Sequence, residues 1–441
     1  MKKLLFSASC LIALSTPLSA ENTTNIIYMI GDGMGPSYTT AYRYFKDDKN
    51  TPEVERTIFD SLFTGLASTS PDDHTVVTDS AAGATALATS TKSYNGAIAV
   101  DKNKNPLKTM LQMAKENGLT TALVATSQIN HATPASFVAH NEYRRNYNDI
   151  ANDYVDVKVN NQLPVDLLLG GGTKYFIRED RNLVSELKLA GYQYESDINN
   201  LNAIESLPAI GLFNKVALPY AIDKNPKRLT KMTAKTLSLL DKDSRKGFFA
   251  MIEASQIDWC GHANDIACAM AEMDDFATSI ELVKSYIDKN PNTLLVVTAD
   301  HSTGGLTLGS DGVYEWKADV IKNVKASGEK IAKALVESND YSLKWIELTG
   351  IELAEEAKNS LSLNIKEIKN SQQKSDRKEA LEQLAKFTKM QIDIASRTGW
   401  TTSGHTAIDV PILAYGKGSE AFRGHMDNTD IAKKLIRIIK Q

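Results

Sequence analysis

Residues 25–35 read Asn-Ile-Ile-Tyr-Met-Ile-Gly-Asp-Gly-Met-Gly, a short apolar run that ends abruptly in glycines. A run of this length, bounded by a turn, is typical of a strand that is buried on both faces. Similar apolar runs recur along the chain, and helix-forming segments separate them. We predict further strands at 119–126, 165–169, 248–252, 293–298 and 410–415, and helices at 107–116, 267–286 and 430–439.

This alternation predicts an α/β fold with a central, mostly parallel β-sheet sandwiched by helices. One region departs from the pattern. From about Tyr314 to Ser396 the sequence is charged, helical in period and poor in strand signals. We expect this region (314–396) to be a helical insertion within a single domain that spans residues 21–441, and not a domain of its own.

The composition narrows the class of protein. The chain has 441 residues, a formal net charge of -4 and 42% hydrophobic residues. This length can bury a large core, and the ordinary composition argues against wholesale disorder. The mildly acidic balance, without a long basic run, does not favour nucleic-acid binding. We therefore expect no nucleic-acid-binding module.

The first 20 residues have the pattern of a secretory signal peptide. Lys2 and Lys3 precede the apolar stretch 4–14, and small residues at 18–20 precede the expected cleavage site. The apolar stretch is shorter than the roughly 20 residues that a membrane-spanning helix needs, so an anchor is the weaker alternative. We expect an exported protein, periplasmic or secreted, with no membrane anchor after cleavage.

Cleavage would remove Cys10 and leave two cysteines, Cys260 and Cys268. An exported protein could join them in a disulfide. On one continuous helix, a separation of eight residues would place them about 12 Å apart along the axis, which is too far for a disulfide. A helix that starts after a loop would leave the question open. We expect no disulfide.

Acidic residues follow three of the predicted strands. Asp32, Glu253 and Asp300 each stand directly after an apolar run. Because the carboxyl ends of parallel strands meet at one edge of a sheet, where ligands bind, these side chains should lie close together. Taken alone, Asp32 could be an ordinary turn residue. The three together predict a cation site.

Histidines could complete such a site. Asp258 and His262 are four residues apart, which places them on one face of a helix and suits two ligands of one metal ion. Such a pair is also common as a simple surface contact. His301 directly follows Asp300, and His405 lies in a polar loop before the last apolar strand. Imidazole with carboxylate favours zinc, whereas carboxylate with hydroxyl favours magnesium.

Ser80 starts a helix-forming run of small residues, Ser-Ala-Ala-Gly-Ala-Thr-Ala at 80–86. A serine in this position could simply cap the helix. It could also be a nucleophile, because a helix N-terminus favours an anion and a metal ion would lower the proton affinity of the hydroxyl. This stretch alone leaves both interpretations open.

Six motifs, in this order, resemble those of the alkaline phosphatase family, and they span nearly the whole chain after the signal pattern apart from the insertion. The resemblance implies hydrolysis of small-molecule phosphate monoesters through a covalent phosphoserine, with release of inorganic phosphate and an alcohol. The motifs are Gly-Asp-Gly-Met-Gly (31–35), Asp-Ser-Ala-Ala with Ala-Thr-Ala (79–86), His-Ala-Thr-Pro-Ala (131–135), Glu-Ala-Ser-Gln-Ile-Asp with His262 (253–262), Thr-Ala-Asp-His-Ser-Thr-Gly-Gly (298–305) and Ser-Gly-His-Thr (403–406).

The resemblance also implies roles for single residues. Ser80 would be the nucleophile, and Arg144, by its spacing from His131, would hold the phosphate, with the adjacent Arg145 as the alternative. Two zinc ions and one magnesium ion per subunit are implied. Their ligands would be Asp258, His262 and His405 for the first zinc, Asp32, Asp300 and His301 for the second, and Asp32, Thr133 and Glu253 for the magnesium.

Two positions differ from the best-known enterobacterial members, which have Asp where His131 stands and Lys where Trp259 stands. The histidine resembles animal and marine bacterial members, and the tryptophan resembles the marine bacterial branch. Without the lysine, one positive charge near the phosphate is missing, so we expect weaker binding of the product. The family resemblance further implies a homodimer.

Two other classes of function compete with this interpretation. One is hydrolysis of phosphodiesters or sulfate esters on the same fold. Related phosphodiesterases use threonine as nucleophile and sulfatases a modified cysteine, so Ser80 in its alanine-rich motif argues against both. The other is an exported metal- or phosphate-binding protein without turnover, which would make that motif incidental.

Overall fold

The computed structural model describes residues 25–243 and 246–441, so the predicted signal peptide at 1–20 lies outside the described residues. Its centre is a ten-stranded sheet. In spatial order the strands are β14 (Gly424–Asp427), β2 (Phe63–Ser68), β13 (Val410–Gly416), β8 (Thr293–Thr298), β1 (Asn25–Gly31), β7 (Phe248–Ala254), β3 (Thr120–Gln128), β4 (Leu167–Gly171), β6 (Ala209–Leu212) and β5 (Gln193–Glu195).

The predicted mostly parallel sheet is confirmed. β1 lies in the middle and pairs in parallel with β7 on one side and β8 on the other. Only β13 runs against its neighbours, β8 and β2. Four strands of this sheet were not predicted, namely β2, β5, β6 and β14. β5, β6 and β14 have only three or four residues, and β2 is an interrupted run, Phe-Thr-Gly-Leu-Ala-Ser, so none of them carries a clear apolar pattern.

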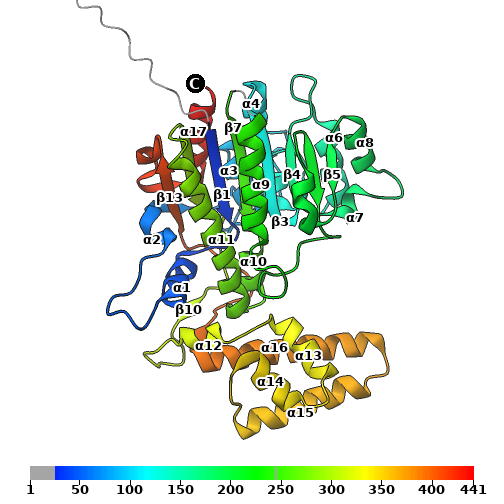
Figure 1. Cartoon of the computed structure of the whole chain (residues 1–441), viewed down its shortest axis with the longest axis vertical. Helices are drawn as coiled ribbons and strands as arrows, with labels where there is room; N and C mark the ends of the chain where they lie inside the picture. Colours follow the sequence, from blue (N-terminus) through cyan, green and yellow to red (C-terminus); the bar gives the residue numbers. More distant parts are fainter. Residues whose placement is uncertain (1–24, 244–245) are drawn as a thin grey trace, which may run out of the picture.

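Helices cover both faces of the sheet (Figure 1). α9 (Arg228–Asp243) and α11 (Ile266–Ile287) pack against each other on one face, and α3 (Ser80–Thr89), α4 (Met110–Glu116) and α17 (Asn428–Ile439) lie on the other. None of the helices in the described part of the chain is long and apolar enough to cross a membrane. The shorter helices are α1 (Pro36–Lys46), α2 (Ile58–Leu62), α5 (Ala132–Ala135), α6 (Tyr147–Asp156), α7 (Thr173–Phe176), α8 (Leu183–Leu189) and α10 (Gln256–His262).

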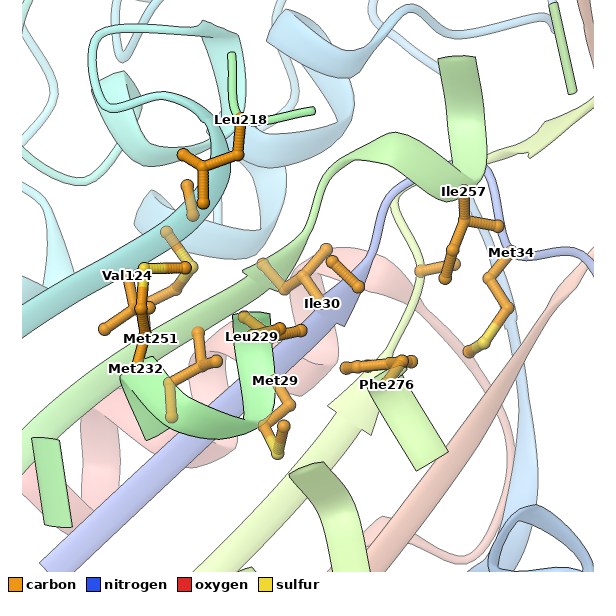
Figure 2. Packing of buried hydrophobic residues seen from close by; sticks show 14 of the residues in the cluster. Met29, Ile30, Met34, Val124, Leu218, Leu229, Met232, Met251, Ile257 and Phe276 are labelled. Carbon is orange, nitrogen blue, oxygen red and sulfur yellow. The ribbon is translucent and has the colours of Figure 1, made fainter. Parts of the chain in front are cut away.

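The core explains the apolar run that opens the described chain. Every residue of β1 after Asn25 is buried, because helices pack on both sides of it. Met29 of β1 lies on the face that α9 and α11 cover, together with Met232 of α9 and Phe276 of α11, and all three are fully buried (Figure 2). Each fully buried side chain of this kind contributes about 1.5–3 kcal/mol, so the middle of the sheet is firmly held.

The predicted insertion is helical. It contains α12 (Ala318–Lys322), α13 (Gly328–Glu337), α14 (Tyr341–Thr349), α15 (Glu355–Asn370) and α16 (Lys374–Ser396). β10 (Thr307–Leu308) and β11 (Thr398–Gly399) pair at its base and hold its two ends together. Figure 1 shows these helices on the side of the sheet toward which the carboxyl end of β1 points.

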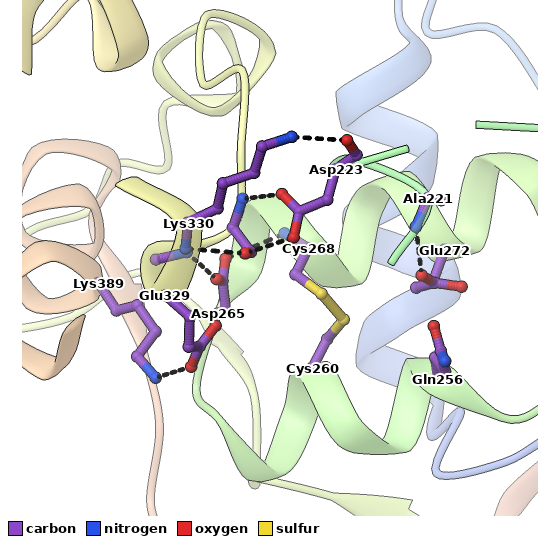
Figure 3. Close-up of a disulfide and its surroundings, with 12 residues drawn as sticks. Ala221, Asp223, Gln256, Cys260, Asp265, Cys268, Glu272, Glu329, Lys330 and Lys389 are labelled. Carbon is purple, nitrogen blue, oxygen red and sulfur yellow. Dashed lines mark hydrogen bonds and ion pairs between the residues drawn. A yellow bond between two sulfur atoms is a disulfide. The ribbon is translucent and has the colours of Figure 1, made fainter. Parts of the chain in front are cut away.

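The prediction of two free cysteines is wrong, because Cys260 and Cys268 form a disulfide with Cα atoms 5.5 Å apart (Figure 3). The two residues do not share a continuous helix. α10 ends at His262, Asn264 takes a left-handed conformation (φ 50°), and α11 starts at Ile266. The carboxylate of Asp265 caps the new helix by accepting a hydrogen bond from the Cys268 amide. This reversal brings the two sulfur atoms together.

Loss of this disulfide should lower stability. A cross-link over a separation of eight residues removes chain entropy from the unfolded state worth roughly 2–3 kcal/mol. We expect the double variant Cys260→Ala/Cys268→Ala to unfold at lower temperature and lower denaturant concentration than the parent under oxidising conditions. With a reductant that breaks the bond, the two proteins should become similar. Equal midpoints under oxidising conditions would contradict the prediction.

Candidate metal centre

Three adjacent strands deliver carboxylates to one edge of the sheet. Asp32 follows β1, Glu253 lies near the end of β7, and Asp300 follows β8. All three are fully buried, and the charges of Asp300 and Glu253 both act on Asp32. The predicted acidic cluster at the carboxyl ends of the strands is therefore present.

The loop after Asp32 needs its glycine at position 33. Gly33 has φ +74°, and its amide donates a hydrogen bond to Asp300 Oδ1 over 3.1 Å. A Cβ atom there would lie 2.7 Å from Thr303 Oγ1 and 2.8 Å from the Cα of Asp258. Both the conformation and the space therefore exclude a larger residue. This close approach brings the loop after β1 against the segment after β8.

A first group of ligand-type side chains consists of Asp258, His262 and His405. α10 contains both Asp258 and His262, so the predicted helical pair is confirmed. Asp258 lies 3.4 Å from His262 Nε2 through Oδ2 and 3.6 Å from His405 Nε2 through Oδ1. The two Nε2 atoms are 3.1 Å apart. Donor atoms of all three residues thus converge on one small volume.

Backbone carbonyls orient both histidines of this group. Nδ1 of His262 lies 2.5 Å from the Ser403 carbonyl oxygen, and Nδ1 of His405 lies 2.9 Å from that of Thr78. Because a carbonyl can only accept, Nδ1 carries a proton in each ring, and in the neutral form Nε2 keeps its lone pair. In that form both rings present an unprotonated nitrogen toward Asp258, as metal-binding histidines do.

A small antiparallel pair of strands places His405. β12 (His405–Thr406) pairs with β9 (Ser302–Thr303), and His405 stands opposite Thr303. The rings of His405 and His301 stack with centroids 3.6 Å apart. Residues separated by about a hundred positions in the chain are therefore neighbours in the site.

A second group surrounds His301. Its Nε2 atom lies 3.4 Å from Asp32 Oδ1, 3.2 Å from Asp300 Oδ2 and 3.1 Å from Ser80 Oγ. His301 is fully buried, and burial holds the pKa of its imidazole well below the usual value. Neutral imidazole, two carboxylates and a hydroxyl thus face one another.

A third group combines Asp32, Glu253, Thr133 and His131. Donor atoms of Asp32, Glu253 and His131 lie within 4.8 Å of one another. Four groups here have no hydrogen-bond partner among the described residues. They are the carboxylates of Asp32 and Glu253, the Thr133 hydroxyl and Nδ1 of His131. His131 was not among the ligands that the family resemblance implied, yet the structure brings its ring to this group.

Ser80 is the first residue of α3 and does not cap it. The cap is Asp79, whose Oδ1 accepts hydrogen bonds from the amides of Ala82 and Gly96. The Ser80 hydroxyl is therefore free to face His301. Of the two interpretations that the sequence left open, capping by Ser80 is wrong.

Arg144 also depends on Asp79. Its Nη1 atom donates to Asp79 Oδ2 over 2.9 Å, while Nη2 lies 3.4 Å from Nε2 of His131. Arg145 is exposed and forms no ion pair with the described side chains. Arg144 is thus the arginine that the fold fixes beside Ser80, and the signal for its anchor, Asp79, was already present in the Asp-Ser-Ala-Ala motif.

The first group opens onto a cavity of about 460 Å³. Ser80, Arg144, His131 and Trp259 line it together with the first group of ligand-type residues. The indole of Trp259 meets the His131 ring edge-on, with centroids 5.8 Å apart. The cavity therefore has a hydroxyl, a guanidinium and an aromatic wall, and it is large enough for a small ester.

The charges of the site do not balance. Burial raises the pKa of Glu253 to about 8 and that of Asp300 to about 7, and it raises the pKa of Asp32 as well. Burial also disfavours the charged form of Asp258, but hydrogen bonding to His262 and the charges of nearby histidines hold its pKa below the usual range. Four buried carboxylates face one guanidinium, and buried charge of this kind needs cations. The residues present therefore fit metal ions.

Fold and site together define a metal-binding hydrolase whose reactive edge suits an anionic ester. A family model for alkaline phosphatase matches residues 23–441. Alkaline phosphatase 3 of Bacillus subtilis is 45% identical over 423 residues, which is 95% of this chain and 90% of that protein. The chain belongs to the alkaline phosphatase family, and it hydrolyses phosphate monoesters.

Solved structures agree with this assignment. The cold-active alkaline phosphatase of a psychrophilic Shewanella sp. is 45% identical, with a TM-score of 0.85 and coverage of 95% of this chain and 100% of that chain. The alkaline phosphatase of the Antarctic bacterium TAB5 is 28% identical, with a TM-score of 0.69 and coverage of 95% and 98%. A variant of the TAB5 enzyme, in which a histidine is replaced by aspartate, is described with Mg bound in its M3 site.

The metal-free protein should lose stability as the pH rises from 7 to 9. The hydrogen bond that the protonated ring donates to Asp258 raises the pKa of His262 to about 8, and burial raises that of Glu253 to the same value. The folded state then holds protons that the unfolded state releases, so this stability is fully present only below the ordinary pKa values, 4.5 for Glu253 and 6.5 for His262, and the last of it is lost as the pH rises through 8. Bound metal replaces these protons. Thermal midpoints with and without a chelator should therefore diverge between pH 7 and 9, and parallel curves would argue against the prediction.

Proposed function

We propose that hydrolysis proceeds through a covalent phosphoserine at Ser80, assisted by two zinc ions and one magnesium ion per subunit. The observation that carries the proposal is the position of the Ser80 hydroxyl. It lies 3.1 Å from Nε2 of His301, at the N-terminus of α3, while Asp79 takes over the capping of that helix. A serine whose hydroxyl does not cap the helix, and which lies next to ligand-type residues, is suited to act as a nucleophile.

The three groups of the site match the proposed ions. Asp258, His262 and His405 would hold the first zinc, and Asp32, Asp300 and His301 the second. Asp32, Thr133 and Glu253 would hold the magnesium, whose preference for oxygen fits two carboxylates and a hydroxyl. The Mg described in the M3 site of the TAB5 variant supports a magnesium site in this family. The nearby Nδ1 of His131 adds a nitrogen donor to the third group.

In the first displacement Ser80, Arg144 and the start of α3 would have separate roles. Bound metal ions would supply positive charge and lower the pKa of the Ser80 hydroxyl and of a hydrolytic water. Ser80 Oγ forms a bond to phosphorus as the bond to the leaving alcohol breaks. Arg144 holds two phosphate oxygens in its planar fork, and the free amides at the start of α3 face the same anion.

A second displacement completes the cycle. Water attacks the phosphorus of the phosphoserine, the bond to Ser80 Oγ breaks, and inorganic phosphate leaves. Two in-line displacements give net retention of configuration at phosphorus. Because Arg144 is already held by Asp79, the phosphate-binding geometry exists before the substrate arrives, which lowers the cost of reorganisation.

Replacement of the nucleophile should abolish turnover without emptying the metal sites. We expect Ser80→Ala to lower kcat for a chromogenic phosphate monoester by at least about 10³-fold, because no covalent intermediate can form. Metal content by mass spectrometry should match the parent. Acid-quenched parent enzyme should carry phosphate on Ser80, and Ser80→Ala should carry none.

The same assay distinguishes the alternatives. Hydrolysis of a diester or a sulfate ester in preference to the monoester would contradict the proposed mechanism. Zinc uptake without release of phosphate by the parent would favour a binding protein. Activity in Ser80→Ala close to that of the parent would remove Ser80 from the mechanism.

A lysine at position 259 should strengthen product inhibition. Trp259 lines the cavity beside Arg144, and an added ammonium group there would attract the phosphate dianion. We expect Trp259→Lys to lower the inhibition constant for inorganic phosphate several-fold. Leu189→Lys is the matched control, since it adds the same charge at a position that is 89% exposed at the end of α8. Equal inhibition in all three proteins would show that charge at position 259 does not govern release.

We also propose that the protein is exported after cleavage following Ala20 and acts as a homodimer of single catalytic domains. The signal pattern at 1–20 and the family support these statements. The mass of the exported chain and its sedimentation in solution test them.

A further inference from the structure

Thr303 contacts both proposed zinc sites, although neither ligand set includes it. It is fully buried in β9, within the Thr-Ala-Asp-His-Ser-Thr-Gly-Gly motif. Its Oγ1 atom donates a hydrogen bond to Asp258 Oδ1 over 2.5 Å, and the same oxygen lies 3.3 Å from Nδ1 of His301. One hydroxyl therefore lies between a residue of the first group and a residue of the second.

The protons of this contact can be assigned from chemistry alone. A hydroxyl has one proton to donate and lone pairs to accept with, whereas a carboxylate can only accept. The Thr303 proton is therefore directed to Asp258, and its oxygen accepts from Nδ1–H of His301. That arrangement leaves the lone pair of His301 on Nε2, the atom that faces Asp32, Asp300 and Ser80.

The backbone holds Thr303 in this position. Its amide donates to the Gly33 carbonyl over 3.1 Å, and its carbonyl accepts from the Tyr38 hydroxyl over 2.8 Å. It also pairs with His405 across the β9–β12 ladder. Gly33, which has no Cβ, leaves just enough room for the threonine oxygen. The hydroxyl is thus fixed from several directions and cannot easily move to another partner.

His301 differs here from the other two histidines. His262 and His405 are oriented by backbone carbonyls, which no side-chain substitution can remove. His301 is oriented by a side chain that also holds a ligand of the neighbouring site. Its tautomer and the position of Asp258 therefore depend on the same atom.

We propose that Thr303 is a positioning residue that couples the two zinc sites, fixing the Asp258 carboxylate in one and the tautomer of His301 in the other. The proposal rests on the ligand sets assigned under the proposed function. Loss of the hydroxyl frees both ligands together, so both ions should bind more weakly. Partners that orient metal ligands typically contribute 10–100-fold in metal affinity.

Three variants test this coupling. Thr303→Val keeps the shape of the side chain and removes the hydroxyl, while Thr303→Ser keeps the hydroxyl. Thr406→Val is the matched control, because Thr406 lies on the partner strand β12 and its buried hydroxyl has no hydrogen-bond partner among the described residues. Each full-length protein is loaded with zinc, and the release of zinc to a chromophoric chelator is followed until both ions have left.

The expected result is faster release of both zinc ions from Thr303→Val, by about 10–100-fold, with rates within about threefold of the parent for Thr303→Ser and Thr406→Val. Cobalt(II) spectra of the loaded proteins should change for Thr303→Val alone. The thermal midpoint of each metal-free protein reports folding separately.

Two results would overturn the coupling: parent-like release from Thr303→Val, or acceleration of only one zinc ion. A parent protein that binds fewer than two zinc ions would overturn the ligand sets and this inference with them. A parent that binds two zinc ions but forms no phosphoserine would refute the mechanism at Ser80 and leave the coupling to be decided by the release rates.

Discussion

The structure depends on a concentration of negative charge that the protein itself does not neutralise. Asp32, Glu253, Asp258 and Asp300 are at most 3% exposed, and the charge of the Arg144 guanidinium acts on Asp32 and Asp258. Charges taken out of water at this density are strongly unfavourable unless cations accompany them. The polypeptide therefore folds into a shape whose centre is complete only with metal, and the geometry around it serves to keep those carboxylates in place.

The sheet makes this concentration possible. β8, β1 and β7 are adjacent and parallel, so the chain must place the residues that follow them at one edge. Apolar side chains on both faces fix the strands, and the rigid strands in turn hold the acidic residues at their ends in place. The remaining ligands come from short elements attached to this frame. α10 presents Asp258 and His262, and the disulfide from Cys260 ties it to α11, which packs on the sheet. The ladder between β9 and β12 adds His405.

The sequence predicted the parts that follow from long-range regularity. Buried runs such as 293–298 stand where β8 does, and the rule that ligands gather at the carboxyl ends of strands was enough to bring Asp32, Glu253 and Asp300 together. The helical insertion followed from its period and charge. Short strands at and near the sheet edges, such as β5 with three residues, carry no such period and were missed.

The predictions failed where the structure depends on a single backbone angle or on the direction of a single side chain. The disulfide was rejected because a continuous helix was assumed, and the left-handed turn at Asn264 breaks that helix. His131 was expected beside the metal sites but not among the ligand-type side chains of the third group, because spacing along the chain does not show where a ring points. Thr303 was not predicted as a site residue for the same reason, since the sequence does not show which two side chains its hydroxyl contacts. Local chemistry of this kind becomes visible only when the contacts are known.

Asp79 shows how one residue can free another for chemistry. A helix that starts with exposed amides needs an acceptor, and a serine at its start would ordinarily supply one. Here the preceding carboxylate caps α3, accepts from Gly96 and holds Arg144. The serine hydroxyl is thereby left without a structural duty, and the amides and the guanidinium are already directed to the place where an anion would bind. Stability of the helix and the position of the proposed nucleophile thus depend on the same side chain.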